Sequence, residues 1–295
     1  MALQSSGAIS LANIQTEFGG SNPISLSEYY SAASGVPSSG AISISNFYGT
    51  SSVLVATSLT AFSGATVLES GGQGVRWTSN GSWTFTVPGG ISSARIHVIG
   101  AGGGPGAASG GCGAGAGGGG GYKTYTLTEG GSYTITVGNG GSAGYCQGSS
   151  GGSSSFGALI TANGGGGGKA GQSGCGFNYR PAGGTISGHT VGSSGGLGGG
   201  NHDTNCGVFS GGASSYGGGG GGSANGWGCS CATRGVGGSG GGYGGRGGNG
   251  GSCYSGEESG LAYGGGAGGA WGTNKIGAKG VVILQWAAGI KAPGG

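Results

Sequence analysis

Several short patterns in this chain could belong to catalytic or cofactor-binding sites. Gly-x-Ser-x-Gly, the nucleophile motif of serine hydrolases, occurs at residues 148–152 and 192–196. That motif works where a strand precedes the serine and a helix follows it, and no helical pattern follows either position. Residues 164–170 (GGGGGKA) match a phosphate-binding loop in part, but Asn163 and Ala170 replace the first glycine and the final Ser or Thr. Because glycine runs produce such matches by chance, we predict no catalytic residue and no cofactor.

The cysteines are the other residues that could carry chemistry. All seven lie in the glycine-rich part of the chain: Cys112, Cys146, Cys175, Cys206, Cys229, Cys231 and Cys253. The odd count leaves at least one unpaired within a monomer. Disulfides suit a protein released into an oxidising medium, and the alternative is that buried thiols fill gaps between backbones. We predict no metal site, because no zinc spacing is matched by Cys229, Cys231, His189, His202, Asp203 and Cys206.

Glycine is the dominant residue and accounts for 90 of 295 positions. Between Gly102 and Gly269 it forms long runs separated by short inserts. Collagen needs glycine at every third position and abundant proline, whereas this chain breaks that period and has six prolines. Two interpretations stay open. The segment is disordered, or it forms a bundle of polyglycine II helices, which have three residues per turn and no internal hydrogen bonds.

Such a bundle would be marginal without support. Rods that lack Cβ atoms can approach closely enough for main-chain hydrogen bonds, each contributing about 0.5–1.5 kcal/mol net. Fixing a residue costs about 1–2 kcal/mol of backbone entropy, and glycine loses the most. Support could come from a β-domain that holds both ends of the bundle, from disulfides, or from aromatic residues that cover its faces: Tyr216, Tyr243, Trp227 and Trp271.

Four inserts between glycine runs are the candidate binding loops. An aromatic face stacks on a sugar or a receptor side chain, and amide and acid groups take directed hydrogen bonds. Loops on a rigid scaffold often carry function, although aromatic residues that cap the bundle and Asn or Asp residues that close turns would give the same pattern. The candidate receptor-binding residues are Phe177, Asn178, Tyr179, Arg180, Asn201, His202, Asp203, Trp227, Arg234, Tyr254, Glu257 and Glu258.

The first 50 residues differ from the rest and contain an internal repeat. Residues 6–14 align with residues 39–47, at an offset of 33. Each copy reads as an extended piece followed by a serine-capped helical turn, and residues 25–28 have capping-box spacing for a third. We expect this module to attach the chain to something larger or to oligomerise, through Leu11, Ile14, Phe18, Leu26, Tyr29, Ile44 and Phe47.

Strand patterns occupy the middle and the end of the chain. Apolar and polar residues alternate in 83–87 and 94–99, and residues 122–127 and 133–137 flank a turn that predicts a hairpin. We predict a mostly β and irregular fold: a short-helix N-terminal module, a small antiparallel β-domain and a polyglycine II bundle. The boundaries are 1–51 for the module, 52–164 plus 277–290 for the β-domain, and 101–121 plus 165–276 for the bundle.

Charge and hydropathy exclude several classes of partner. The formal net charge is +3, and no basic cluster tracks a phosphate backbone, so we expect no nucleic-acid binding. No window approaches the 18 apolar residues of a membrane span, so we expect no membrane insertion. The N-terminus lacks the basic and apolar regions of a secretory signal, so we expect the protein to be made in the cytoplasm. A chain that works outside a cell must then leave another way, of which lysis with an assembled particle is one.

Two sets of motifs resemble proteins of tailed bacteriophages. The segments SSGAISLANIQTEFGG (5–20), NPISLSEYY (22–30) and SGAISISNFYG (39–49) are similar to the N-terminal segment of many phage structural proteins. The segments resembling the glycine-rich domain of tail fibres are SWTFTVPGG (82–90), ARIHVIGAGGG (94–104), YTITVGNGG (133–141), SSFGALITANGGGGG (154–168) and GAKGVVILQW (277–286).

The resemblance implies a structural protein of the virion tail, a fibre or adhesin, with no enzymatic activity. Its partners would be other phage tail proteins and a bacterial surface receptor, protein or glycan, and a homotrimer would fit a fibre. In similar adhesins, loops at one end of a polyglycine II sandwich touch the receptor. A non-viral structural or ice-binding protein is the alternative, and a depolymerase lacks a paired acid because Glu257 and Glu258 are adjacent.

Overall fold

The structure is a computed structural model. It describes residues 3–18, 22–30, 32–33, 35–50, 62–68, 74–88, 91, 93–106, 113–170, 179–200, 209–223, 235–251, 258–269 and 275–286. Within these ranges the fold is mostly β, with two antiparallel sheets, one α-helix and short 3₁₀ turns. The predicted fold class is therefore confirmed at this level.

The N-terminal module contains α1 (Leu11–Phe18) and two 3₁₀ turns, η1 (Leu26–Tyr29) and η2 (Ile44–Phe47). Each element follows a serine whose side chain and backbone pair with the residue three positions on. These reciprocal bonds satisfy amide groups that the first turn of a helix leaves without a partner. The three capped turns expected from the sequence are thus confirmed.

Two sheets form a sandwich in the part of the chain that follows the module. The first sheet has the order β1 (Thr66–Val67), β2 (Gly74–Trp77), β11 (Val281–Trp286), β4 (Ser93–Ile99), β5 (Gly120–Thr126) and β10 (Val191–Ser193). The second has the order β3 (Gly81–Thr86), β6 (Ser132–Val137), β7 (Ser154–Phe156), β8 (Ile160–Ala162) and β9 (Ile186–Ser187). All strand pairs among the described residues are antiparallel.

The main apolar core lies between the two sheets. It is rich in aromatic residues, and Phe62 stacks on Trp286 with ring centroids 5.3 Å apart. The inward side chains of β4 are Ala94, Ile96 and Val98, as the alternating pattern predicts. The other face of β4 and β11 is covered too, which is why β11 is apolar along most of its length.

The hairpin predicted for residues 122–137 is wrong. β5 pairs with β4 and β10 in the first sheet, whereas β6 pairs with β3 and β7 in the second. The turn at residues 129–131 therefore carries the chain from one sheet to the other. Alternation alone could not reveal this, because crossing between the layers of a sandwich and turning back within a sheet present the same local pattern.

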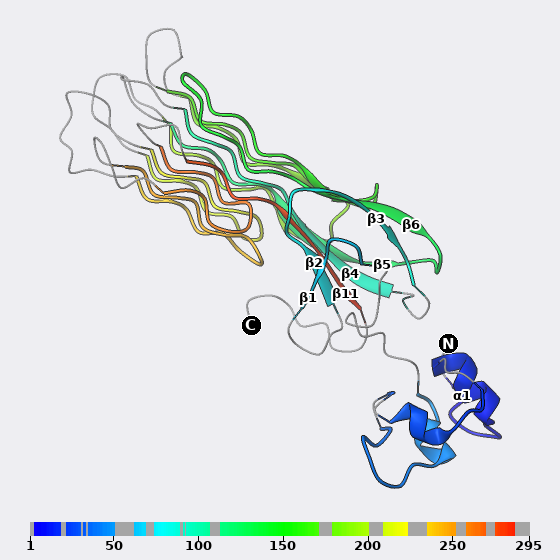
Figure 1. Ribbon diagram of the computed structural model, residues 1–295. Helices are drawn as coiled ribbons and strands as arrows, with labels where there is room; N and C mark the ends of the chain where they lie inside the picture. The colour runs from blue at the N-terminus through cyan, green and yellow to red at the C-terminus, as the bar shows by residue number, and fades with distance from the viewer. Residues whose placement is uncertain are drawn as a thin grey trace.

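The glycine-rich segments continue the strands beyond the edge of the sandwich. Figure 1 shows them running side by side away from the sheets, and backbone hydrogen bonds link each to its neighbours. We call these hydrogen-bonded segments, which lie within residues 100–280, the glycine-rich bundle, or simply the bundle. Residues 100–106 continue β4, residues 113–119 lead into β5, and residues 275–280 lead into β11. The glycine-rich insertion thus begins and ends on the same sheet, which holds its segments in place.

The hydrogen bonds of residues 114–119 follow a strict rotation. Successive N–H groups donate to three different neighbouring segments, and every third residue returns to the same one. The donor–acceptor pairs are Ala114–Gly199 and Gly117–Gly196, Gly115–Ala267 and Gly118–Gly264, and Ala116–Gly166 and Gly119–Asn163. The carbonyl groups of residues 113–119 accept from three further segments, 100–106, 184 and 218–221. This segment thus has hydrogen-bonded neighbours on six sides.

Glycine is required inside this arrangement because the backbones are in contact. A Cβ on Gly118 would lie 2.0 Å from the carbonyl oxygen of Gly100, and one on Gly220 would lie 1.9 Å from that of Leu197. Where the neighbour leaves room the chain carries alanine, as at Ala114 and Ala116, which are fully buried. The bundle therefore packs backbone on backbone, and a methyl group in the wrong place would separate two segments.

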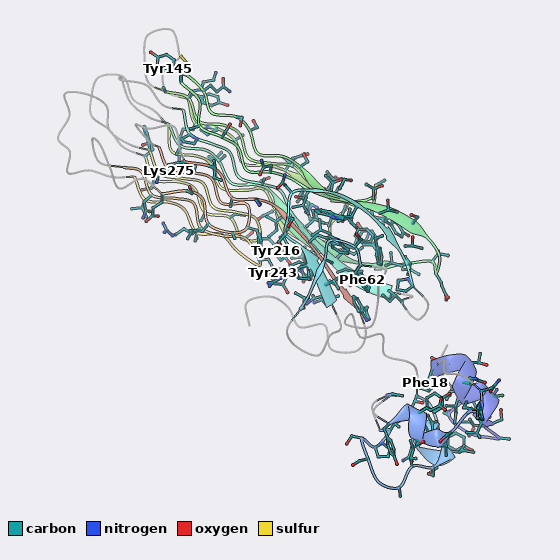
Figure 2. The ribbon with its side chains drawn as sticks, in the orientation of Figure 1. Phe18, Phe62, Tyr145, Tyr216, Tyr243 and Lys275 are labelled. Carbon is teal, nitrogen blue, oxygen red and sulfur yellow. The ribbon has the colours of Figure 1, made fainter. Side chains whose placement is uncertain are left out.

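Tyrosines on the bundle's inner turns pack against the outer face of the first sheet. Tyr216 and Tyr243, expected to cover the bundle, lie at this junction (Figure 2) and surround the buried side chain of His97. Tyr243 also packs with Ile99, Val281 and Ile283. These tyrosines therefore shield from solvent the face of the first sheet that points away from the main core. The other two residues expected to cover the bundle lie outside the described residues: Trp227 and Trp271.

Candidate functional site

The end of the bundle farthest from the sheets is the candidate site (Figure 1). The described segments stop here at the borders of six intervals: 107–112, 171–178, 201–208, 224–234, 252–257 and 270–274. Backbone hydrogen bonds link residues on these borders to one another. The donor–acceptor pairs are Gly106–Gly113, Ser223–Phe209, Gly269–Gly222 and Gly251–Gly269. The last three bonds join the borders of intervals 201–208, 224–234, 252–257 and 270–274, whereas Gly106 and Gly113 border the same interval. A Cβ on Gly106 would lie 2.7 Å from the backbone nitrogen of Ala170, and one on Gly200 would lie 3.3 Å from the carbonyl oxygen of Tyr179. The borders of all six intervals therefore lie together at one end.

Tyr179 and Arg180 are the described members of the first candidate loop. The Nζ of Lys169 lies 4.5 Å from the centre of the Tyr179 ring, a cation–π contact. The guanidinium of Arg180 donates to the carbonyl oxygens of Gly198 and Ser210, at 3.2 and 3.1 Å. It also lies over the ring of Phe209, the residue before Ser210. Arg180 therefore ties neighbouring segments together, which gives it a part in holding the scaffold.

Glu258 is the described member of the fourth candidate loop. Its Oε2 accepts from Arg246 Nη2 at 2.9 Å and from the N–H of Asn249 at 3.2 Å. The backbone N–H of Asn249, together with the Arg246 guanidinium, holds the pKa of Glu258 below its usual value. Arg246 also donates to Asn249 Oδ1 at 2.9 Å. This carboxylate is part of a network that fastens the border of the loop.

Other exposed residues near this end were not singled out from the sequence. Tyr145 is 70% exposed, and Figure 2 shows it at the tip, at the same end as Lys275. Val236 and Ile276 are also exposed, at 58% and 48%. The sequence does contain a feature that could have identified Tyr145: it lies in a three-residue insert between Gly144 and Gly148. This insert is shorter than the four that were chosen as candidate binding loops.

The cysteine beside Tyr145 bears on the thiol question. Cys146, the one cysteine among the described residues, is disulfide-bonded. For Cys146 the structure therefore departs from the interpretation that the cysteines are buried free thiols. The backbone carbonyl of Cys146 also accepts from Ala170, next to the border of interval 171–178.

The remaining candidate receptor-binding residues lie outside the described residues. They are Phe177, Asn178, Asn201, His202, Asp203, Trp227, Arg234, Tyr254 and Glu257. Their roles stay predictions, and the structure gives the position only of the bundle segments that border them.

All seven residues assigned to attachment lie in the N-terminal module. Ile14, Tyr29 and Phe47 are buried in its core, and the Phe18 ring packs against Tyr29 and Phe47 at 6.1 and 5.8 Å. The other three pack on the same core but are only partly buried: Leu11, Leu26 and Ile44. The buried residues hold the module together, and the partly buried ones keep part of their surface exposed.

The fold and the bundle together define a glycine-rich domain supported by a β-sandwich. A family model described as a glycine-rich domain matches residues 78–287, which is more than half of the chain. The chain belongs to this family. No curated protein matches the sequence. Within the described residues, no helix is long and apolar enough to cross a membrane.

Proposed function

We propose that the chain is a structural protein of a bacteriophage tail, a fibre or adhesin, that binds a receptor on the bacterial surface. The N-terminal module attaches it to other tail proteins. The glycine-rich bundle holds its binding loops at the end opposite the β-sandwich. The proposal rests on the phage-like segments of residues 5–49 together with the gathering of six interval borders at one end of the bundle.

We also propose that the bundle segments are polyglycine II helices. The supporting observation is the rotation of hydrogen bonds along residues 114–119, in which every third residue returns to the same neighbour. A helix with three residues per turn points each of its N–H groups in this way. Rigid segments of this kind would present loops without the entropic cost of ordering the scaffold on binding.

Binding specificity belongs to the loops in this proposal, including the candidates in intervals 171–178, 201–208, 224–234 and 252–257. Tyr145, exposed at the same end, adds an aromatic surface for a sugar or a receptor side chain. The scaffold supplies position, and the inserts supply chemistry.

Purified protein tests the proposal directly. It should adsorb to a particular bacterial strain and block infection by the phage that carries it. A chain without residues 1–50 should still adsorb but should not enter particles. Exchange of residues 227–234 for the corresponding insert of another such protein should change the strains that are bound, whereas adsorption unaffected by every exchange of the inserts would contradict the assignment of specificity to the loops.

A further inference from the structure

The three capped turns of the N-terminal module are all copies of one sequence repeat. Each has an isoleucine, a capping serine, an aliphatic residue, an exposed small residue, a capping partner and a buried apolar residue. The three sets are residues 9–14 (ISLANI), 24–29 (ISLSEY) and 42–47 (ISISNF). The last residue of each set is buried, and the serine of each is exposed. The third copy escapes a comparison at one fixed offset because the spacings between copies differ.

The cap contacts repeat with the sequence. In each turn the backbone N–H of the serine donates to a side-chain oxygen three residues on, at 2.8–3.2 Å. The pairs are Ser10 with Asn13, Ser25 with Glu28 and Ser43 with Asn46. Equivalent residues therefore make equivalent bonds, which defines a structural repeat.

The contacts between turns close a ring. The residue five positions after each capping serine donates to the residue three positions before the next one, and the third turn donates back to the first. These contacts are Gln15 to Asn22 at 3.4 Å, Tyr30 to Gly40, and Tyr48 to Gly7. Because each junction joins the same two positions, the turns follow one another around a closed ring with threefold repetition.

The two ends of the module meet at the last junction. The N–H of Leu3 donates to the carbonyl oxygen of Thr50 at 2.7 Å, and that of Gly49 donates to the carbonyl oxygen of Gln4 at 3.0 Å. A ring that closes within one chain satisfies each junction internally, so none is left open to recruit another copy.

We propose that the three turns of the N-terminal module form a threefold ring that seats one chain on the threefold axis of a homotrimeric partner protein. The inference rests on the proposed attachment of this module to the phage tail. Leu11, Leu26 and Ile44 occupy the same position in the three turns and are partly exposed. Related by the rotation, they lie at one height around the axis and offer three matching apolar contacts.

A homotrimer is the partner that this pattern fits. The end of a homotrimer presents one identical site per subunit. A threefold ring can bind all three sites at once, because the first contact positions the ring for the other two. An asymmetric partner would contact the three positions unequally. The N-terminal module of a second copy of this chain would also have threefold symmetry and is the alternative partner. In that case the purified chain would form a dimer.

The closing experiment measures stoichiometry and the three positions in parallel. Purified full-length chain is added to phage particles that lack its gene product, and bound chains are counted by quantitative mass spectrometry against the tail protein to which they cross-link. We expect one bound chain per three copies of that protein. L11Q, L26Q and I44Q should each weaken binding by roughly tenfold, as expected for loss of one apolar contact.

The control variant is T16Q, on the part of α1 that has no counterpart in the other turns, and it should bind like the unchanged chain. Circular dichroism verifies that each variant is folded, and the stoichiometry needs no variant. Three bound chains per three copies, a loss confined to one position, or a dimer that L11Q separates would overturn the inference. A chain that adsorbs to cells but never binds particles would overturn the attachment and the ring inference with it, whereas one that binds particles but not cells would overturn only the receptor proposal.

Discussion

The hydroxyl of Tyr216 hydrogen-bonds to Nδ1 of His97, and this contact joins the glycine-rich bundle to β4. The other ring nitrogen, Nε2, lies 3.0 Å from Gln285 Oε1. Because an amide oxygen only accepts, Nε2 carries the proton and Nδ1 accepts from the tyrosine. A neutral imidazole satisfies both partners. A second proton would bind to Nδ1, which could then no longer accept the hydrogen bond from the Tyr216 hydroxyl.

The first prediction concerns acid. Burial lowers the pKa of His97 from 6.5 to about 4. Between these pH values the unfolded chain binds a proton that the folded chain does not, so stability falls as the pH drops through this window. The total loss below pH 4 is roughly 3 kcal/mol. The described groups that face the imidazole supply no carboxylate to offset it: Arg95, Tyr122, Tyr216, Tyr243 and Gln285.

Thermal unfolding at pH 7 and pH 4, followed by tryptophan fluorescence, measures this loss. H97Q keeps a donor and an acceptor but cannot titrate, and it should lose less stability between the two pH values than the unchanged chain. Equal losses in both proteins would show that other groups govern the acid response.

The second prediction concerns glycine inside the bundle. G118A would bring a methyl group 2.0 Å from the carbonyl oxygen of Gly100, so two backbones must separate. We expect a loss of about 3 kcal/mol, at the upper end for overpacking. G166A is the matched control, because the nearest atom to its Cβ would be a side-chain carbon of Pro181 at 3.2 Å. Denaturant unfolding should separate the two variants, and similar midpoints would argue against backbone-on-backbone packing.

The third prediction concerns the caps of the N-terminal module. Glu28 Oε1 accepts from the N–H of Ser25 at 3.2 Å. E28A removes this acceptor and should destabilise the module by about 1 kcal/mol, whereas E28Q keeps an oxygen in place and should have a smaller effect. Hydrogen exchange of the amides in residues 22–30 measures the difference, and the idea fails if E28Q exchanges as fast as E28A.

The fourth prediction separates recognition from stability. Tyr145 is mostly exposed, so Y145A should leave the unfolding temperature almost unchanged while weakening adsorption to cells. R180M removes two bonds to backbone carbonyls and should lower the unfolding temperature. Adsorption and melting curves on the two variants test this contrast, which would be refuted by Y145A binding cells as tightly as the unchanged chain.

Local signals in the sequence were sufficient for the capped turns and for the inward face of β4. Serine followed three residues later by Asn or Glu marks a cap, and alternation marks a half-buried strand. The partners of the strands could not be predicted in the same way. β5 and β6 are adjacent along the chain yet belong to different sheets, because pairing depends on the layers of the whole sandwich.

The glycine-rich part shows the limit most clearly. A run of identical residues has no pattern that distinguishes one register from another, so the sequence does not say that Gly117 faces Gly196 and Gly118 faces Gly264. The same holds for the candidate site. Its aromatic and charged inserts are visible in the sequence, but only the bonds and close contacts among the described residues that border them show that these borders lie at one end of the bundle.

Hydrogen–deuterium exchange of the glycine amides in residues 113–119 and 217–222 tests the central claim most directly. Both segments are buried, and the N–H groups of residues 114–119 and 218–222 are hydrogen-bonded to neighbouring segments. Cross-linked backbones predict exchange slowed by several orders of magnitude, as in the core strands β4 and β11. Exchange at the rate of an unstructured peptide, in protein whose β-sandwich stays protected, would contradict the account.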